Sequence, residues 1–350
     1  MKILKRNLVF IIISVMVVSF SSKAINASLN ISKREVAKIA VVCYDLKHPY
    51  VLLIKENLEK IQNNNPNKVA FTFFDSEKNS STQLQNINTT IQNDFDSVIL
   101  NVVEQSSSVI DDIVFKAKQR NIPLIFWASS VPNTDVLQKY SRAFSLNEDN
   151  DVISAMQGNF IVGMWNSNKE IIDKNGDDIF EYILLRGYPN NPLDMQREKS
   201  SIRTIHDGIG KTQELETVFA YWDENLAEES ISSLFLKYGN KIDAIITTGD
   251  ALAIGAVKAL QKYDYNKGDK SKSILVVGID CLPEAKNLVE KGFMAGTFYF
   301  SFYLKSQAMY DVSMNLISYK NPIDGTNLKR CDKKITITGI PEQYIMNFNS

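Results

Sequence analysis

The sequence predicts an α/β protein with two doubly wound lobes, each built on a parallel sheet. From residue 36 onward, short and almost continuously apolar runs alternate with amphipathic stretches. Strands that are apolar on both faces and are separated by helices are typical of a parallel sheet covered on both sides. The alternation starts again after residue 148, and 350 residues exceed the size of one ordinary domain. One larger sheet is the alternative, but two series of similar length favour two lobes.

The first series holds four apolar runs with helical patterns between them. The predicted strands are Val36–Tyr44, Val69–Phe74, Ser97–Val103 and Pro123–Ala128. The predicted helices are Pro49–Gln62, Ser81–Asn93 and Ser107–Arg120. Because strand–helix–strand connections are right-handed, the series predicts one doubly wound sheet.

The second series repeats this organisation. The predicted strands are Phe180–Arg186, Leu215–Trp222, Ala244–Thr248 and Ser273–Asp280. The predicted helices are Asn150–Ile172, Leu193–Asp207, Asn225–Lys237, Ala251–Gln261 and Pro283–Lys291. Among them, Ala251–Gln261 shows apolar residues at the spacing of a helix most clearly.

The chain after Ala295 adds a strand, a long helix near Leu304–Tyr319 and a strand near Ile335–Gly339. These elements return to the first lobe and then to the second. The predicted first lobe is therefore 36–128 plus 299–327, and the second is 129–298 plus 328–350.

The N-terminus has the layout of a secretory signal peptide over residues 1–27. Lys2, Lys5 and Arg6 precede an apolar run over Leu8–Phe20, which is short for a membrane span. Cleavage is expected near Ala27, and a retained N-terminal anchor is the alternative. Either way, the protein is expected to work outside the cytoplasm, in the periplasm or on the outer face of the membrane.

Composition excludes several classes of function. A formal net charge of -1 leaves no basic surface for nucleic acid or anionic membrane. The chain has only two histidines, which does not favour a histidine-based zinc site or a Ser/His/Asp triad. Neither G-x-G-x-x-G nor G-x-x-x-x-G-K-[ST], the glycine-rich loops of nucleotide-binding proteins, is present. The spacing of Cys43, Cys281 and Cys331 fits no metal motif, and the first two are expected to be buried thiols.

Groups suited to a neutral polyol stand near the predicted strand ends. Ligands of open α/β sheets bind at the carboxyl ends of strands. An amide, a carboxylate and a guanidinium can bond hydroxyl groups, and aromatic rings can cover the apolar faces of a sugar. The candidates are Asn101, Asp280, Arg197, Trp222 and Tyr50. Each also has a structural interpretation, such as a helix cap for Asp280, core for Trp222 and a solvated face for Arg197.

The loop after residue 172 follows the first nine positions of a calcium loop. Oxygen-bearing side chains alternate, and a backbone carbonyl stands at position seven. The candidate ligands are Asp173, Asn175, Asp177, the Ile179 carbonyl and Glu181. Position six is Asp178 rather than glycine, and position twelve is Leu184 rather than a carboxylate. A solvated acidic turn is the alternative.

Four stretches resemble the periplasmic galactose/glucose-binding proteins of ABC sugar transporters. They are Gly249–Leu260, Val277–Ala285, Leu184–Pro189 and Gly292–Thr297. The resemblance covers nearly the whole mature chain. It implies the type 1 periplasmic binding fold, with two Rossmann-like lobes joined by a hinge of three crossovers. It also implies a structural Ca²⁺ on the acidic loop, with Asp243 as the distant carboxylate.

The sugar site of this family is matched in part. Its aromatic pair falls on Tyr50 and Trp222, and its Asn, Arg and Asp fall on Asn101, Arg197 and Asp280. Other family positions carry different residues in this chain, namely His48, Asn191, Leu193, Gly249 and Phe300. Each lost hydrogen-bond partner would cost about 1–3 kcal/mol for the same ligand.

The resemblance implies a monomeric, non-enzymatic protein that binds a monosaccharide related to galactose or glucose. It would deliver its ligand to an ABC permease. The alternative is a sugar sensor that presents its closed form to a membrane receptor kinase. A hydrolase would need two carboxylates across the cleft, for which Asp280 and Asp194 are the only candidates. A DNA-binding regulator is excluded because the signal segment takes the place of a helix-turn-helix.

Overall fold

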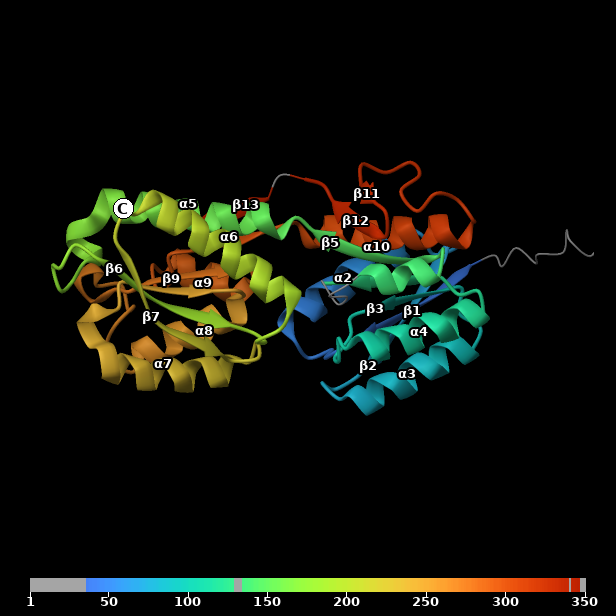
Figure 1. The fold of residues 1–350 in the computed structure, drawn as a ribbon, viewed down its shortest axis with the longest axis horizontal. Helices are drawn as coiled ribbons and strands as arrows, with labels where there is room; N and C mark the ends of the chain where they lie inside the picture. Colours follow the sequence, from blue (N-terminus) through green and yellow to red (C-terminus); the bar gives the residue numbers. More distant parts are fainter. Residues whose placement is uncertain (1–35, 129–133, 340, 347–350) are drawn as a thin grey trace, which may run out of the picture. The chain divides into compact units, whose positions relative to one another are not determined.

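The structure, a computed structural model, describes residues 36–128, 134–339 and 341–346. The predicted signal peptide lies outside the described residues. The chain separates into a unit over residues 1–36 and a unit over residues 37–350. Two sheets form the unit over residues 37–350, each covered by helices (Figure 1), which confirms the predicted two-lobe α/β fold.

The first sheet has seven strands in the order β11-β12-β5-β4-β3-β1-β2. Its strands are β1 (Ala37–Cys43), β2 (Val69–Asp75), β3 (Ser97–Leu100), β4 (Leu124–Trp127), β5 (Ala143–Glu148), β11 (Lys329–Cys331) and β12 (Lys334–Ile337). Helices α2 (Pro49–Asn64) and α10 (Phe302–Ile317) pack on one face, and α3 (Ser80–Gln92) and α4 (Ser107–Gln119) pack on the other. All its strands are parallel except β11.

The second sheet has six strands in the order β13-β10-β9-β8-β6-β7. Its strands are β6 (Phe180–Arg186), β7 (Thr212–Phe219), β8 (Ala244–Thr247), β9 (Leu275–Ile279), β10 (Gly296–Tyr299) and β13 (Glu342–Ile345). Helices α5 (Asn150–Ile172) and α6 (Pro192–Gly208) cover one face. The other face is covered by α7 (Glu224–Tyr238), α8 (Asp250–Gln261) and α9 (Pro283–Glu290). Only β13 runs antiparallel.

The chain passes between the sheets three times, but not at the predicted boundaries. Strand β5 pairs with β4, so the first passage falls between β5 and α5 rather than at residue 129. Strand β12 pairs with β5, so residues 329–337 belong to the first lobe rather than the second. The second passage joins β10 to α10, and the third joins β12 to β13. Strand β5 ends in the polar residues Asn147 and Glu148, which hide it in the sequence.

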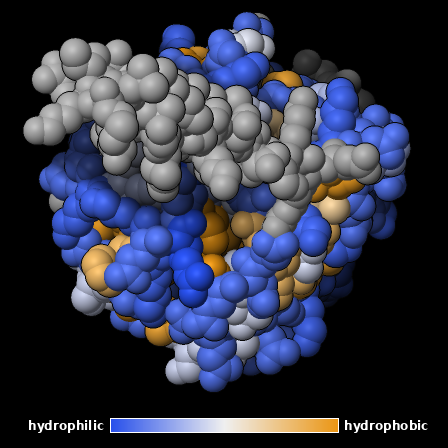
Figure 2. Space-filling model, turned by 90° about the vertical axis from the view of Figure 1, so that its right-hand side faces the viewer, coloured by the Kyte–Doolittle hydropathy of each residue, from blue (hydrophilic) through white to orange (hydrophobic). Residues whose placement is uncertain are grey.

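Apolar side chains concentrate between each sheet and its helices. Cys43 and Cys281 are buried, as predicted, whereas Cys331 is exposed. Outside the grey atoms, the face drawn in Figure 2 is mainly hydrophilic, with small apolar areas. Such a surface is ordinary for the outer side of amphipathic helices.

The strand order of each sheet indicates where a ligand would bind. In the first sheet β1 lies between β2 and β3, and in the second β6 lies between β7 and β8. The strand order therefore reverses at β1 and at β6. Ligands of doubly wound sheets bind at such reversals, beyond the carboxyl ends of the strands.

Candidate functional site

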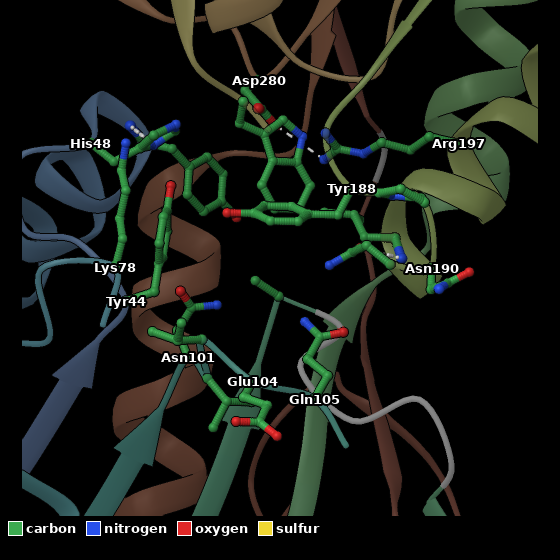
Figure 3. A pocket seen from close by; sticks show the side chains of 18 residues that line it. Tyr44, His48, Lys78, Asn101, Glu104, Gln105, Tyr188, Asn190, Arg197 and Asp280 are labelled. Atoms are coloured by element: carbon green, nitrogen blue, oxygen red, sulfur yellow. Dashed lines mark hydrogen bonds and ion pairs between the residues drawn. The ribbon is translucent and has the colours of Figure 1, made fainter. Parts of the chain in front are cut away.

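A cavity of about 350 Å³ lies beyond these strand ends and takes its lining from both lobes (Figure 3). Seven of the eight predicted ligand-binding residues line it, namely His48, Tyr50, Asn101, Asn191, Arg197, Trp222 and Asp280. Phe300 does not, because it is buried in the core of the second lobe. The volume and the mixture of aromatic and polar side chains are typical of a small-molecule site.

Arg197 organises the polar side of the cavity. It is only 3% exposed, which excludes the solvated-face interpretation. Its Nη2 donates to Asp280 Oδ1 at 3.0 Å, its Nη1 to the Thr248 carbonyl at 2.6 Å and its Nε to Asn150 Oδ1 at 3.2 Å. Burial by itself lowers the pKa of Arg197, but the charges of Asp280 and Glu148 outweigh it and raise that pKa. The guanidinium is therefore a permanent cation that is already paired with protein groups.

Trp222 is held against the backbone of Gly187. A Cβ at Gly187 would lie 2.3 Å from Trp222 Cε2, so the indole packs where any other residue would carry a side chain. Tyr188 packs edge-on against the same indole, with ring centroids 5.3 Å apart. Trp222 is half-buried and lines the cavity, so it is not core. It also lies three residues beyond the end of β7, not in the strand as predicted.

Several cavity residues have backbone conformations that side-chain-bearing residues rarely adopt. Lys78 has φ 58°, Ala128 φ 55°, Trp222 φ 53° and Asp280 φ 116°. Such conformations cost free energy and cluster at functional sites. They turn the chain sharply just after β2, β4, β7 and β9 and point side chains toward the cavity. Asp280 does not cap α9, whose N-cap residue is Leu282.

Tyr50 supplies an aromatic wall from the first lobe. Its ring stacks on Trp127 with centroids 6.0 Å apart and meets Phe302 edge-on at 5.3 Å. Its hydroxyl accepts a hydrogen bond from Lys305 Nζ at 3.2 Å. Burial raises the pKa of Tyr50 well above its usual value, so the hydroxyl stays protonated. The ring is thus fixed on three sides.

His48 stands at the first-lobe edge of the cavity and caps α2. Its Nδ1 accepts a hydrogen bond from the Tyr50 backbone N–H at 3.3 Å. Burial lowers the pKa of His48 to about 4; Asp45 and Asp223 oppose this shift, and Lys78 adds to it. The imidazole is therefore neutral at pH 7, with its proton on Nε2.

Replacing His48 by asparagine is expected to weaken the acid sensitivity of the fold. Between pH 6.5 and 4 the unfolded chain binds a proton on His48 that the folded chain does not. The stability from this group is therefore complete above pH 6.5 and falls by about 2 kcal/mol between pH 7 and pH 5. Asparagine keeps the helix cap without titrating. Urea unfolding at both pH values measures the difference, and an identical pH dependence of both proteins would contradict it.

An ion pair spans the mouth of the cavity. Lys78 Nζ lies 3.6 Å from Asp45 Oδ2 and 3.8 Å from Asp223 Oδ2. Asp45 follows β1 in the first lobe, whereas Asp223 is the N-cap residue of α7 in the second. The positive charge is shared by two carboxylates, so it does not favour an anionic ligand.

Sequence reasoning missed six polar or aromatic residues that line the cavity. They are Tyr44, Lys78, Glu104, Gln105, Tyr188 and Asn190. All stand in the loops that follow β1, β2, β3 and β6. The rule that ligands lie beyond strand ends pointed to these loops, but it selects no side chain within them.

Two of the predicted residues, Asn191 and Asp194, have structural roles, and Asn191 lines the cavity as well. Asn191 Oδ1 accepts from the backbone N–H groups of Leu193 and Asp194 and so caps α6. Asp194 is fully buried and bonds the backbone N–H groups of Gly187 and Tyr188. It does not line the cavity, so it does not form with Asp280 the pair of carboxylates considered for a hydrolase.

The acidic loop joins α5 to β6. Asp173 accepts from the backbone N–H groups of Gly176 and Asp178, and Asn175 Nδ2 donates to Asp177 at 2.9 Å and to Glu181 at 2.8 Å. In the described ranges, no group of three or more His, Cys, Asp or Glu side chains is arranged to hold a metal ion. The predicted ligands are therefore neighbours, but they do not form a ready metal cage.

Comparison with known proteins agrees with this architecture. A family model described as a periplasmic binding protein domain matches residues 39–321. The D-galactose/methyl-galactoside binding periplasmic protein of Haemophilus influenzae is 25% identical over 314 residues, which cover 89% of this chain and 91% of that protein. The D-allose-binding periplasmic protein of Escherichia coli is 25% identical over 284 residues, covering 79% of this chain and 84% of that protein.

Solved structures share the fold. A periplasmic solute binding protein of an ABC transporter from Actinobacillus succinogenes, solved with bound D-allose, has a TM-score of 0.71 at 16% identity and covers 88% of this chain and 96% of its own. A solute binding protein of an ABC transporter from Bacillus halodurans, solved with bound myo-inositol, has a TM-score of 0.70 at 18% identity, with coverages of 90% and 96%.

Every helix in the described part of the chain is too short or too polar to span a bilayer. The family model spans most of the sequence, and both lobes follow the fold of its relatives. The chain therefore belongs to the periplasmic binding protein family, whose members bind ligands outside the cytoplasm and are not enzymes.

Proposed function

We propose that this protein is the substrate-binding component of an ABC importer and holds an uncharged monosaccharide related to galactose or glucose. The observation that carries the proposal is the cavity wall made by Tyr50, Trp222, Arg197 and Asp280. Aromatic faces suit the apolar C–H faces of a sugar, and the fixed Asp280 carboxylate suits its hydroxyl groups. The relatives named for D-galactose and D-allose support the same class of ligand.

The charges around the cavity favour a neutral ligand. Arg197 is paired with Asp280, and Lys78 is paired with Asp45 and Asp223. A charged ligand would have to break one of these pairs, at a cost that its own contacts must exceed. A sugar needs no such exchange, because its hydroxyl groups bond to groups whose charges are already balanced.

Lobe closure is the proposed mechanism. Both lobes contribute lining residues, so a ligand gains its full set of contacts only when the two walls face each other. Its binding free energy then stabilises the closed arrangement, which a membrane permease recognises. In the closed arrangement, the ion pair between Lys78 and Asp223 also joins the two lobes at the mouth of the cavity.

A thermal-shift screen of the full chain tests the proposed ligand class. The panel holds D-galactose, D-glucose, D-allose, methyl galactosides, L-arabinose and myo-inositol, with calcium present. A ligand at 100 times its Kd should stabilise the protein by about 2.7 kcal/mol. The double variant Trp222→Leu/Asp280→Asn should lose that shift, whereas Glu290→Gln, outside the cavity, should keep it. The absence of a shift with every sugar, or a shift that persists in the double variant, would contradict the proposal.

We also propose that the acidic loop binds a structural Ca²⁺ through Asp173, Asn175, Asp177, the Ile179 carbonyl, Glu181 and Asp243. Asp178, at the position where calcium loops carry glycine, has φ 64°, the conformation that glycine provides. Asp243 Oδ1 is buried and has no hydrogen-bond partner among the described residues. Burial raises the pKa of Asp243 to about 7, and the negative charge of Asp173 contributes to this increase.

A cation would resolve this excess of negative charge. Glu181 is buried beside Asp243, whose Oδ2 accepts from the Glu181 backbone N–H at 2.8 Å, and Lys241 Nζ lies 3.9 Å from Glu181 Oε1. Oxygen ligands of this type and number match the preference of Ca²⁺. Bound there, the ion would fasten the end of α5 to the start of β6 and take no part in ligand binding.

Calcium is expected to raise the unfolding temperature of the full chain reversibly. At 100 times its Kd the ion should add about 2.7 kcal/mol, and a chelator should remove the gain. Asp243→Asn should abolish the response, while Asp112→Asn, at an exposed carboxylate on α4, should retain it. Calorimetric titration gives the stoichiometry. A chain that shows neither heat of binding nor a thermal response to calcium would refute the assignment.

A further inference from the structure

A buried chain of charges connects the two walls of the cavity. Glu148 Oε1 lies 3.2 Å from Lys305 Nζ and 3.4 Å from Arg197 Nη2. Arg197 continues to Asp280 at 3.0 Å, and Lys305 continues to the Tyr50 hydroxyl at 3.2 Å. The order along this chain of charges is therefore Asp280, Arg197, Glu148, Lys305 and Tyr50. Its two ends line the cavity from opposite lobes.

Glu148 and Lys305 occupy two of the three passages between the sheets. Glu148 is the last residue of β5, where the first passage begins. Lys305 lies one turn into α10, just after the second passage. They are 9% and 2% exposed, so water screens their attraction poorly. The contact therefore joins the two connections about which the lobes would move.

Arg197 also holds the first passage through Asn150, which lies two residues after Glu148. Asn150 Oδ1 accepts from Arg197 Nε at 3.2 Å, and Asn150 Nδ2 donates to the Glu148 carbonyl at 3.3 Å. Residues 148–150 are thus bound by a second-lobe side chain on one side, while Lys305 of the first lobe binds the Glu148 carboxylate. Lys305 also lies 4.7 Å from the Tyr50 ring centroid, which orients that ring as well as its hydroxyl.

We infer that Glu148 is a positioning residue that couples the two cavity walls, with Lys305 as its partner. Its carboxylate is the common counter-ion of one cation from each lobe. It fixes Arg197, and through it Asp280, in the second lobe, and Lys305, and through it Tyr50, in the first. The inference rests on the proposed ligand site, but its test needs no ligand, so the two can fail separately.

Charge balance makes the coupling testable. The four charged groups sum to zero, and removal of Glu148 alone leaves Arg197 and Lys305 as two buried cations that repel each other from opposite lobes. Removal of both Glu148 and Lys305 restores neutrality, because Arg197 still pairs with Asp280. Loss of one partner of a buried pair destabilises strongly, whereas loss of both is often tolerated. The double variant therefore separates folding stability from positioning.

Trp222 reports on the cavity without a ligand. The chain has three tryptophans, and Trp127 and Trp165 are 2% and 5% exposed, so the half-buried Trp222 is the one most accessible to a quencher. Acrylamide is uncharged, and its quenching is therefore insensitive to the charge changes of the variants. The experiment measures acrylamide quenching and urea unfolding of the full chain as wild type, Glu148→Gln, Lys305→Met and the double variant. Glu59→Gln, at an exposed pair on α2, is the control.

Glu148→Gln should at least double the quenching constant and lower the urea midpoint, since repulsion separates the walls. The double variant should recover most of the midpoint but keep the raised quenching constant, because no counter-ion then joins the lobes. A purely structural ion pair would restore both quantities together, and that result would overturn the inference. Unchanged quenching in the folded double variant, or an equal rise in Glu59→Gln, would overturn it as well.

Discussion

Replacing Arg197 by methionine is expected to lower the free energy of unfolding by about 3–5 kcal/mol and to abolish ligand-dependent stabilisation. The substitution leaves the buried Asp280 carboxylate without its cation and removes the donors bonded to Asn150 Oδ1 and the Thr248 carbonyl. An uncompensated buried charge is among the costliest single defects in a protein. Chemical unfolding at pH 7 measures the first effect, and the thermal-shift panel measures the second.

Arg203 provides the matched control on the same helix. It is 78% exposed, and among the described residues its ion pair is with Asp207, at 3.7 Å. Arg203→Met should change the stability by no more than about 0.5 kcal/mol and leave ligand binding intact. A loss below about 1 kcal/mol in Arg197→Met, or equal losses in the two variants, would show that the cavity is not organised around this guanidinium.

Gly187→Ala is the second substitution with a large expected effect, because the new Cβ would occupy the place of the Trp222 indole. Trp222 Cε2, Nε1 and Cδ2 all lie within 2.6 Å of that Cβ position. The indole must move, at a cost of about 1–3 kcal/mol in stability. Affinity for the ligand should fall at least tenfold, about 1.4 kcal/mol, although no polar cavity group has changed.

Gly163→Ala is the corresponding control. A Cβ at Gly163, within α5, would have no described atom within 4 Å apart from its chain neighbours and the nearby backbone of its own helix. Alanine there should stabilise the helix by about 0.5–1 kcal/mol and leave the affinity unchanged. Calorimetric titration with the best sugar of the panel measures both variants. Unchanged affinity in Gly187→Ala would mean that Trp222 does not form part of the ligand site.

The sequence predicts strands and helices well where apolar runs are long and the period is clear. The buried strand β6 is found at its predicted bounds, Phe180–Arg186. Strand β5 was missed because it ends in Asn147 and Glu148, which read as loop. Residues 328–350 were predicted to belong to the second lobe, which is wrong for β12. This strand pairs with β5, nearly 190 residues earlier in the chain, and such a distant pairing leaves no local signal in the sequence.

Site residues could be predicted when they stand near the ends of recognisable elements. Arg197 and Asp280 are such residues, and the strand-end rule and the family resemblance both point to them. Only the family resemblance predicted that Phe300 lines the cavity. In the structure its apolar side chain is buried in the core of the second lobe. Lys78 was missed because its loop has an unusual turn, and nothing in the amino-acid pattern says where such a turn directs a side chain. Tyr188 was missed because the strand-end rule points to a loop and not to a side chain within it.

Residue 148 illustrates a different limit. A glutamate between an asparagine and an aspartate suggests a solvated turn, yet Glu148 is buried between two cations that lie 49 and 157 residues further along the chain. Burial of a charge depends on partners that only the folded chain brings together. No rule based on sequence spacing would have paired it with Lys305.

The central claim is that a sugar binds against Trp222 between the lobes, and a fluorescence titration tests it most directly. Wild type and Trp222→Phe are titrated as full chains with each sugar of the panel, and binding to both is verified by thermal shift. Phenylalanine keeps an aromatic wall, so both proteins should bind. We predict a saturable change in tryptophan emission for at least one sugar in the wild type and none in the variant. No saturable change in the wild type with any sugar, or a change that survives in Trp222→Phe, would contradict the account.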